Sequence, residues 1–358
     1  MNLFRSEEHV KRWGLYDPAS EDFIMAVADW ADVFSGPMHR NRLDPDYLER
    51  SGEYLAEYHR RLNERGKATS FWMIPFIQGL EAISLERYRV VGNYIRFEAE
   101  VLNALKDVRA RIQAGLVQPG HRRENHLLWA PPGSGKTFFV QQVAEALGPS
   151  AAYAELNLAR MDEGGFRAAL AGWEADESAR LVLIDEVDAR SGERWPYEAL
   201  LPYLDLGMEG GRPLVIVLAG SSAHSLDEMK RQMAERPKGK DVLSRVPGEH
   251  QAVIPAMTFG DRVLVMLSQF RQAGRELGRE MRSVEKMALY YAAVNPRLAN
   301  VRQLREFAVR AVDRVRPGDD RVKYDSLFEP GDPANKLFWL EAHEMARALV
   351  NSFVLVTD

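Results

Sequence analysis

A short glycine-rich stretch contains the residues whose types and spacing best suit catalysis. Residues 130–137 have the sequence APPGSGKT. The glycines tolerate positive φ, so that backbone N–H groups can turn inward around a phosphate chain. Lys136 can bring a positive charge to the β- and γ-phosphates of a nucleotide, and the Thr137 hydroxyl suits Mg²⁺. The residues expected to bind nucleotide in this phosphate-binding loop (P-loop) are Pro132, Gly133, Ser134, Gly135, Lys136, Thr137 and Phe138.

The flanks of this loop support the same prediction. An apolar stretch ending in LLW precedes it and a helical pattern follows it. A P-loop requires this succession of strand, loop and helix. The strict pattern GxxxxGK[ST] has a glycine where this chain has Ala130, which is the smallest substitute. A chance glycine-rich turn is the alternative, and the flanks disfavour it.

An acidic pair is the second candidate for catalysis. Asp185 and Glu186 follow the four apolar residues LVLI. Because ligands bind at the carboxyl ends of the strands in a parallel sheet, both acids should lie beside the P-loop. Asp185 is expected to hold Mg²⁺, directly or through water, and Glu186 to orient or deprotonate an attacking water. An acid pair that merely begins a helix is the alternative, which the upstream P-loop disfavours.

The composition limits the possible classes of protein. The 358 residues carry a net charge of −5, which does not indicate an affinity of the whole surface for nucleic acid. There are no cysteines, so disulfides are excluded, and the eight histidines lack the spacing of a zinc motif. No apolar run has the length of a membrane span, and the N-terminus lacks an apolar signal core. We therefore expect a cytoplasmic location and no membrane partner.

The elements around the candidate residues alternate between strands and helices. Strands that alternate with helices favour a parallel sheet that is covered on both faces. The strands are expected at residues 126–129, 151–158, 181–184 and 214–219, with helices at 136–147 and 164–175. A long amphipathic helix should precede the P-loop. The apolar stripe of that helix is expected at Ile95, Val101, Leu102, Leu105, Val108 and Ile112.

Helical patterns dominate both ends of the chain. The N-terminal candidates are residues 21–34 and 45–62. After residue 258 only helical patterns remain, except that the apolar residues 353–356 could form an added strand or a peptide for a partner, or could equally be frayed or packed on the core. The expected helices there are residues 260–277, 283–294, 301–315 and a last one from Asp332 to about residue 350.

Residues 86–316 resemble the AAA+ family of ATPases. APPGSGKT resembles the Walker A motif of this family, and LVLIDE at residues 181–186 resembles its Walker B motif. The family places a polar sensor 1 residue after the strand that corresponds to residues 214–219. The resemblance implies this role for Ser222, with Ser221 as the alternative.

The same resemblance gives two arginines an expected role. DVLSRV at residues 241–246 is similar to the "SR" segment of clamp-loader-type AAA+ proteins, which implies that Arg245 is an arginine finger completing the site of a neighbouring subunit. ANVRQL at residues 299–304 is similar to the sensor 2 string of bacterial enhancer-binding activators, although Ala299 replaces a glycine. This implies that Arg302 reaches the γ-phosphate. Rival fingers are Arg236, Lys238, Lys240 and Arg262.

The segment before the long helix is a weaker candidate. Val-Val-Gly at residues 90–92 resembles the segment that packs on the adenine in this family, which implies adenine contacts for Val91 and Gly92. A simple apolar start of the helix is an equal alternative.

The predicted fold class is α/β: a P-loop NTPase parallel sheet sandwiched by helices, an all-helical AAA+ lid and a mostly helical N-terminal region. The expected domains are a partner or client domain at residues 1–85, the nucleotide-binding domain at 86–257, the lid at 258–316 and a helical extension at 317–358.

The resemblance implies Mg²⁺-dependent ATP hydrolysis in an oligomeric ring, often a hexamer, that remodels a protein client recruited by the N-terminal region. In such a ring Phe166 could be a pore aromatic, but a core position is preferred. The alternative is a nucleic-acid-dependent ATPase, such as a loader or a component of a mobile element or defence system, which the basic tract between Lys230 and Lys240 keeps open. A scaffold that rarely turns over has less need of Glu186.

Overall fold

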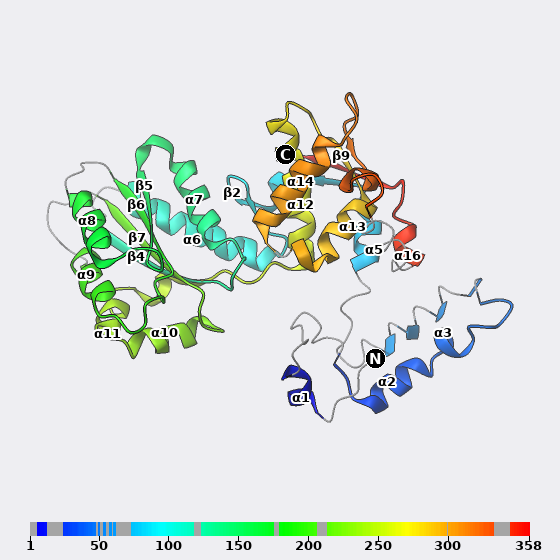
Figure 1. Ribbon diagram of the computed structural model, residues 1–358, viewed down its shortest axis with the longest axis horizontal. Helices are drawn as coiled ribbons and strands as arrows, with labels where there is room; N and C mark the ends of the chain where they lie inside the picture. Colours follow the sequence, from blue (N-terminus) through cyan, green and yellow to red (C-terminus); the bar gives the residue numbers. More distant parts are fainter. Residues whose placement is uncertain are drawn as a thin grey trace. The chain divides into compact units, whose positions relative to one another are not determined.

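The computed structural model describes two units of the chain, Met1–Leu80 and Glu81–Asp358 (Figure 1). The described residues are 6–12, 24–47, 49–50, 53–54, 57–58, 60–61, 73–117, 123–174, 179–205, 213–298, 300–332 and 344–358. None of the helices in these ranges is both long and apolar enough to span a membrane.

The first unit consists of short helices in its described residues. These helices are α1 (Glu7–Lys11), α2 (Val27–Phe34), α3 (Pro37–Arg40) and α5 (Met73–Gln78). Val33 of α2 is fully buried and packs with Tyr58, Met25, Trp30 and Met38. The helix expected at 21–34 begins at Val27, and residues 21–23 lie outside the described ranges. Within the expected helix 45–62, residues 45–47 form a turn and the described part of 53–61 is helical.

The second unit contains a five-stranded parallel sheet. Its strand order is β5-β6-β7-β4-β8. The strands are β4 (Arg123–Trp129), β5 (Ala152–Asn157), β6 (Arg180–Asp185), β7 (Leu214–Gly220) and β8 (Gln251–Val253). Trp129 pairs with Gly220, and Ile184 pairs with Leu218, so β4, β6 and β7 end at the same edge. The P-loop, the acidic pair and the serines after β7 therefore emerge side by side.

Helices cover both faces of this sheet, because its strands are apolar on both sides. Leu181 and Leu183 face one core together with α6 (Ala99–Val117) and α7 (Lys136–Leu147). Val182 and Ile184 face the other core. The helices on that second face are α8 (Glu163–Glu174), α9 (Trp195–Leu204), α10 (Leu226–Ala234) and α11 (Gly239–Leu243). The expected α/β sandwich is confirmed.

A short hairpin precedes α6. β2 (Arg89–Val91) and β3 (Tyr94–Ile95) pair in antiparallel fashion across a turn in which Gly92 has φ +50°. The expectation that Ile95 belongs to the stripe of the long helix is wrong. Gly92 allows the chain to fold back, so that Ile95 lies in β3 and the helix begins only at Ala99.

The lid follows the sheet and consists mainly of α12 (Phe259–Glu276), α13 (Lys286–Val294) and α14 (Val301–Asp313). Thr258 and Asp261 form a capping box that begins α12, and Asn300 and Gln303 form one that begins α14. The expectation of an all-helical lid is wrong in one respect, because residues 283–285 form a strand that joins three strands from outside residues 258–316 in a four-stranded sheet of order β1-β11-β9-β10.

This small sheet brings together distant parts of the chain. Its strands are β1 (Ala82–Ser84), β9 (Ser283–Glu285), β10 (Arg321–Val322) and β11 (Phe353–Thr357). Val284 of β9 is 1% exposed and pairs with Val354 of β11. The helix expected at 283–294 therefore starts only at Lys286. Of the helix expected after Asp332, residues 333–343 lie outside the described ranges, and α16 (Glu344–Arg347) is helical.

Candidate nucleotide-binding site

The P-loop has the backbone conformation that a phosphate cradle requires. Gly133 and Gly135 have φ values of +80° and +87°, which L-residues rarely adopt. The Ser134 hydroxyl donates to the Pro131 carbonyl over 2.7 Å and fixes the turn. Helix α7 begins at Lys136, so its unpaired N–H groups and the positive end of its dipole face the loop. Pro132 and Gly133 are exposed at the tip of the loop.

Lys136 lies between the two predicted acids. Its Nζ atom is 3.2 Å from Asp185 Oδ1 and 3.1 Å from Glu186 Oε1. The Thr137 hydroxyl donates to Asp185 Oδ2 over 3.0 Å. Burial by itself lowers the pKa of Lys136, but the two carboxylates more than offset this effect and hold its pKa above the ordinary value. Four residues from two distant segments thus form one charged cluster.

Glu186 has an unusual backbone. Its φ of +55° lies in the left-handed region, which costs a residue with a side chain about 1–2 kcal/mol. This conformation turns the chain sharply at the end of β6 and directs the Glu186 carboxylate toward Lys136. Strain of this kind persists where the surrounding structure enforces it, as at catalytic sites.

The two serines after β7 take different partners. The Ser221 hydroxyl donates to Glu186 Oε2 over 3.3 Å. The Ser222 hydroxyl instead donates to Asp188 Oδ2 over 2.6 Å. The backbone N–H groups of both serines also donate to that oxygen, over 2.8 and 2.7 Å. Ser222, the first choice for sensor 1, is therefore directed away from Glu186, whereas Ser221 contacts it.

Asp188 is a residue that the sequence analysis missed. It is 5% exposed, and its carboxylate holds the turn that places Ser221. Gly220 allows this close approach, because a Cβ there would lie 2.8 Å from the Asp188 carboxylate. The only sequence signal is a third acid two residues after Glu186, and it does not reveal which serine the carboxylate holds.

We expect Ser221→Ala to lower the turnover of a nucleotide by about 10- to 100-fold, since a hydrogen bond to a charged group contributes about 1.5–3 kcal/mol. Ser222→Ala should change turnover much less, because Asp188 keeps both backbone N–H donors. Phosphate release by the two purified variants tests this expectation. A larger loss in Ser222→Ala would return the sensor 1 role to Ser222.

A buried arginine joins the P-loop to the lid. Arg96 is 1% exposed, and its Nη1 lies 2.9 Å from Asp261 Oδ2 at the start of α12. Its Nη2 donates to the carbonyls of Ser134 and Pro255, over 3.2 and 2.9 Å. Burial alone lowers the pKa of Arg96, but Tyr94 and Asp261 outweigh it and raise the pKa above its usual value. The sequence showed only an arginine before a helix.

Comparison with known families decides the identity of this domain. Residues 126–237 match the sequence model of AAA, the "ATPase family associated with various cellular activities". The match covers the P-loop, the acidic pair and the serines of the cluster described above. Residues 126–237 of this chain are therefore a domain of the AAA family. Among curated proteins, no sequence matches it.

Two solved structures are similar to this chain. NtrX from Brucella abortus in complex with ADP is 15% identical and has a TM-score of 0.46, with 72% of this chain and 64% of that chain covered. A point mutant of RuvB from Thermotoga maritima is 18% identical and has a TM-score of 0.43, with 69% and 71% covered. This chain thus spans less than two thirds of the NtrX chain.

A pocket beside the P-loop lies between the hairpin and the lid. Its lining comes from β3, from the loop, and from α12 and α14. The lining residues include Asn93, Tyr94, Ser134, Gly135, Phe138 and Val301. The Tyr94 ring packs edge-on against Phe139 at 5.2 Å. Val91 and Gly92, the expected adenine contacts, are not in this lining, which begins one residue later.

Arg302 lies in the first turn of α14, directly after Val301 of this pocket. It is exposed, and no partner for its side chain exists among the residues that the structure describes. This position suits a cation that acts on a nucleotide from the lid.

Arg245 lies far from the P-loop of its own chain. Its Nε is 2.6 Å from Asp205, and its Nη1 donates to the Asp241 carbonyl over 2.7 Å. Its own carbonyl accepts from Asn125, at the start of β4. The P-loop leaves the other end of that strand, roughly 13 Å away at the usual rise per residue. The structure therefore brings Arg245 to the opposite edge of the sheet from Lys136.

Three of the rival fingers are engaged within their own chain. Arg236 donates to the carbonyls of Asp188 and Ala189. Arg262 donates to three carbonyls of the lid, and burial lowers its pKa. Lys238 pairs with Asp241 at 3.3 Å.

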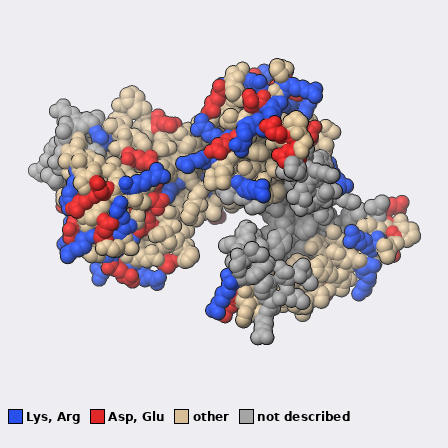
Figure 2. Space-filling model, in the orientation of Figure 1, with Lys and Arg blue, Asp and Glu red and all other residues tan. Residues whose placement is uncertain are grey.

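Phe166 and the basic tract kept a pore-lining role and nucleic-acid binding open as alternatives, and both have structural roles in the folded domain. Phe166 is fully buried and packs against Trp195 at 5.6 Å, so it is a core residue as preferred. Lys230 and Arg231 of the basic tract pair with Asp227 and Glu228. Figure 2 shows basic and acidic side chains interspersed over the described surface of this domain on the face that it draws.

Proposed function

We propose that this AAA+ protein hydrolyses ATP with Mg²⁺ in an oligomeric ring. The observation that carries the proposal is the cluster in which Lys136 contacts both acids, Thr137 contacts Asp185, and Ser221 contacts Glu186. This cluster places a cation, a metal-binding pair and a candidate base at the end of a glycine-rich loop.

The residues of the cluster divide the work of phosphoryl transfer to water. The loop N–H groups hold the phosphate chain, and Lys136 neutralises charge on the β- and γ-phosphates. Glu186 accepts a proton from the attacking water, and Ser221 orients its carboxylate. Arg302 approaches the γ-phosphate from the lid. The backbone turn at Glu186 keeps its carboxylate at the edge where the strands end.

The donor set fits Mg²⁺. The Thr137 hydroxyl and the Asp185 carboxylate are hard oxygen ligands 3.0 Å apart, and Mg²⁺ prefers a few such ligands together with waters and phosphates. When bound, Mg²⁺ neutralises charge that develops on the transferred phosphate.

An oligomer is supported by the place of Arg245. An arginine finger must reach the γ-phosphate, and Arg245 lies at the far edge of the sheet in its own chain. A neighbouring subunit can bring its Arg245 to this site, as in the ring, often a hexamer, that the family resemblance implies.

A protein client fits better than nucleic acid as the partner. Lys230 and Arg231 of the basic tract are paired with acids of their own helix, and the net charge is negative. We propose that residues 1–80 recruit this client, since they form a unit of their own. The nucleic-acid-dependent alternative predicts that single-stranded DNA, duplex DNA or RNA raises the ATPase rate. The cytoplasmic location stays a prediction.

Lys136→Ala tests the nucleotide assignment. It removes one partner of a desolvated charge interaction, so ATP binding should weaken by roughly 30-fold or more. Binding of a fluorescent ATP analogue measures the effect, with Lys323→Ala, an exposed lysine beyond the lid, as the matched control. Tight binding retained by Lys136→Ala would contradict the assignment of the P-loop.

A further inference from the structure

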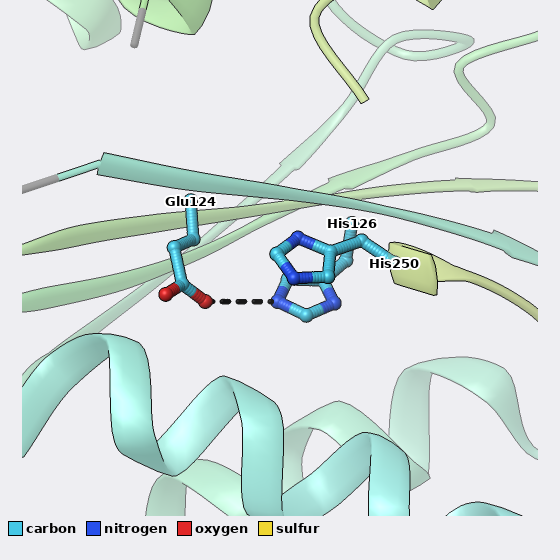
Figure 3. Close-up of side chains that lie close together, drawn as sticks. All are labelled: Glu124, His126 and His250. Atoms are coloured by element: carbon cyan, nitrogen blue, oxygen red, sulfur yellow. Dashed lines mark ion pairs between the residues drawn. The ribbon is translucent and has the colours of Figure 1, made fainter. Parts of the chain in front are cut away.

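Three side chains that can bind a metal meet at the end of the sheet opposite the P-loop (Figure 3). Glu124 and His126 lie two residues apart on β4 and so face the same side. His250 comes from the 3₁₀ turn Gly248–His250, directly before β8, the strand that pairs with β4. One ligand atom from each of the three residues lies within 4.8 Å of the others.

His126 has an unsatisfied nitrogen in this cluster. The residue is 1% exposed, and its Nε2 has no hydrogen-bond partner among the described residues. Glu124 Oε2 lies 3.7 Å from this nitrogen, which is too far for a hydrogen bond. A buried polar atom without a partner costs about 1–3 kcal/mol. A ligand that accepts the nitrogen lone pair would remove this cost.

His250 is held with its other nitrogen free to bind. Its Nδ1 is 3.2 Å from the Asn125 carbonyl oxygen, which can only accept a hydrogen bond. Nδ1 therefore carries the proton, and the lone pair is on Nε2. A backbone carbonyl on the far nitrogen is the usual way in which a protein orients a metal-binding histidine.

A glycine also leaves space for the Glu124 carboxylate. Gly115 of α6 faces Glu124, and a Cβ at this glycine would lie 2.7 Å from Glu124 Oε2. A larger residue at position 115 would force the Glu124 carboxylate or the Val215 side chain to shift. Arg111 donates to the Glu249 carbonyl beside His250, and its positive charge opposes the binding of a cation nearby. The negative charge of the Glu124 carboxylate offsets the charge of Arg111.

We propose that Glu124, His126 and His250 bind a divalent transition-metal ion of the Zn²⁺ class. Two imidazoles and one carboxylate form an established ligand set for Zn²⁺, with a water in the fourth position. Mg²⁺ and Ca²⁺ are disfavoured because they take oxygen ligands. The two rings are stacked 4.4 Å apart. Because a histidine nitrogen binds Zn²⁺ in the plane of its ring, at least one of the two stacked rings must rotate out of the stack for both to bind the same ion.

The ion would tie β4 to the segment that carries Arg245. Asn125, between two of the ligands, donates its side-chain N–H groups to the carbonyls of Arg245 and Leu204 over 2.9 and 2.8 Å. His250 follows Arg245 by five residues in the same connection. A bound ion therefore stabilises the turn between the candidate finger and β8. Binding of this ion does not require ATP hydrolysis.

The test measures Zn²⁺ binding by the full-length protein after treatment with a chelator. We expect one Zn²⁺ per chain by metal analysis, and a rise of several degrees in the thermal midpoint at about a hundredfold excess over the dissociation constant. Excess Mg²⁺ should not displace the ion. His250→Gln, a half-buried position, should weaken binding by at least about 10-fold, and Glu124→Gln should do the same.

The control is His9→Gln, which removes an exposed histidine of the first unit. It should bind Zn²⁺ as the unchanged protein does. Absence of Zn²⁺ binding by the unchanged protein overturns the proposal and leaves a stacked histidine pair. Equal binding by His250→Gln and His9→Gln overturns it as well, because the ion then lies elsewhere.

Discussion

Replacing Glu186 with glutamine should leave ATP binding intact and lower its turnover by about 10²- to 10⁴-fold, the usual contribution of a general base. The amide keeps the size of the carboxylate and can still contact Ser221, but it cannot accept a proton from water. Lys136 keeps Asp185 as a partner, so the charge of the P-loop is not left alone. Phosphate release measures turnover, and binding of a fluorescent ATP analogue measures affinity.

A matched variant distinguishes this loss from a general effect of removing an acid. Glu163→Gln changes an exposed glutamate of the same domain whose partner is Arg167. It should hydrolyse ATP at the rate of the unchanged protein. Normal turnover by Glu186→Gln would exclude Glu186 as the base and leave Asp185 and Asp188 as the remaining acids at this edge.

The P-loop and the acidic pair could be predicted because their signals are local. A glycine-rich turn between a strand and a helix is encoded by consecutive residues, and so is an apolar strand that ends in two acids. The parallel sheet then places both at one edge whatever the details of packing. The contacts of Lys136 with Asp185 and Glu186 agree with this expectation.

The choice between Ser221 and Ser222 could not be made from the sequence. Both are small, adjacent and polar, so neither spacing nor composition separates them. The Asp188 carboxylate, 33 residues before Ser221 and 34 before Ser222, decides their orientation by accepting three hydrogen bonds. A contact between residues so far apart in the sequence forms only in the folded chain, so local sequence patterns do not reveal it.

Dependence on residues that are distant in the sequence also explains why the strand β9 in the lid could not be predicted. The helical pattern of residues 286–294 continues upstream through apolar Val284, so periodicity alone extends the helix. Strand formation at Ser283–Glu285 depends on β11, about 70 residues further along the chain. The histidine cluster is a comparable case, since His250 is 124 residues from His126.

Replacing Arg245 with alanine should lower ATP turnover by about 10³- to 10⁵-fold, the range found for arginine fingers. The fold should tolerate the change, because the Arg245–Asp205 ion pair is partly exposed and such pairs contribute about 0–1 kcal/mol. Asp205→Asn breaks the same pair but keeps the arginine. It should therefore retain most of the activity, which the phosphate-release assay measures.

Mixing two inactive variants tests whether Arg245 acts on a neighbouring subunit. Arg245→Ala subunits keep Glu186, and Glu186→Gln subunits keep Arg245. In an equimolar mixed ring, about one interface in four joins an intact Glu186 to an intact Arg245. Activity should therefore reappear on mixing and follow the product of the two fractions. Without any gain at any ratio, Arg245 cannot act across an interface. If Asp205→Asn were as inactive as Arg245→Ala, the arginine would act through the ion pair and not as a finger.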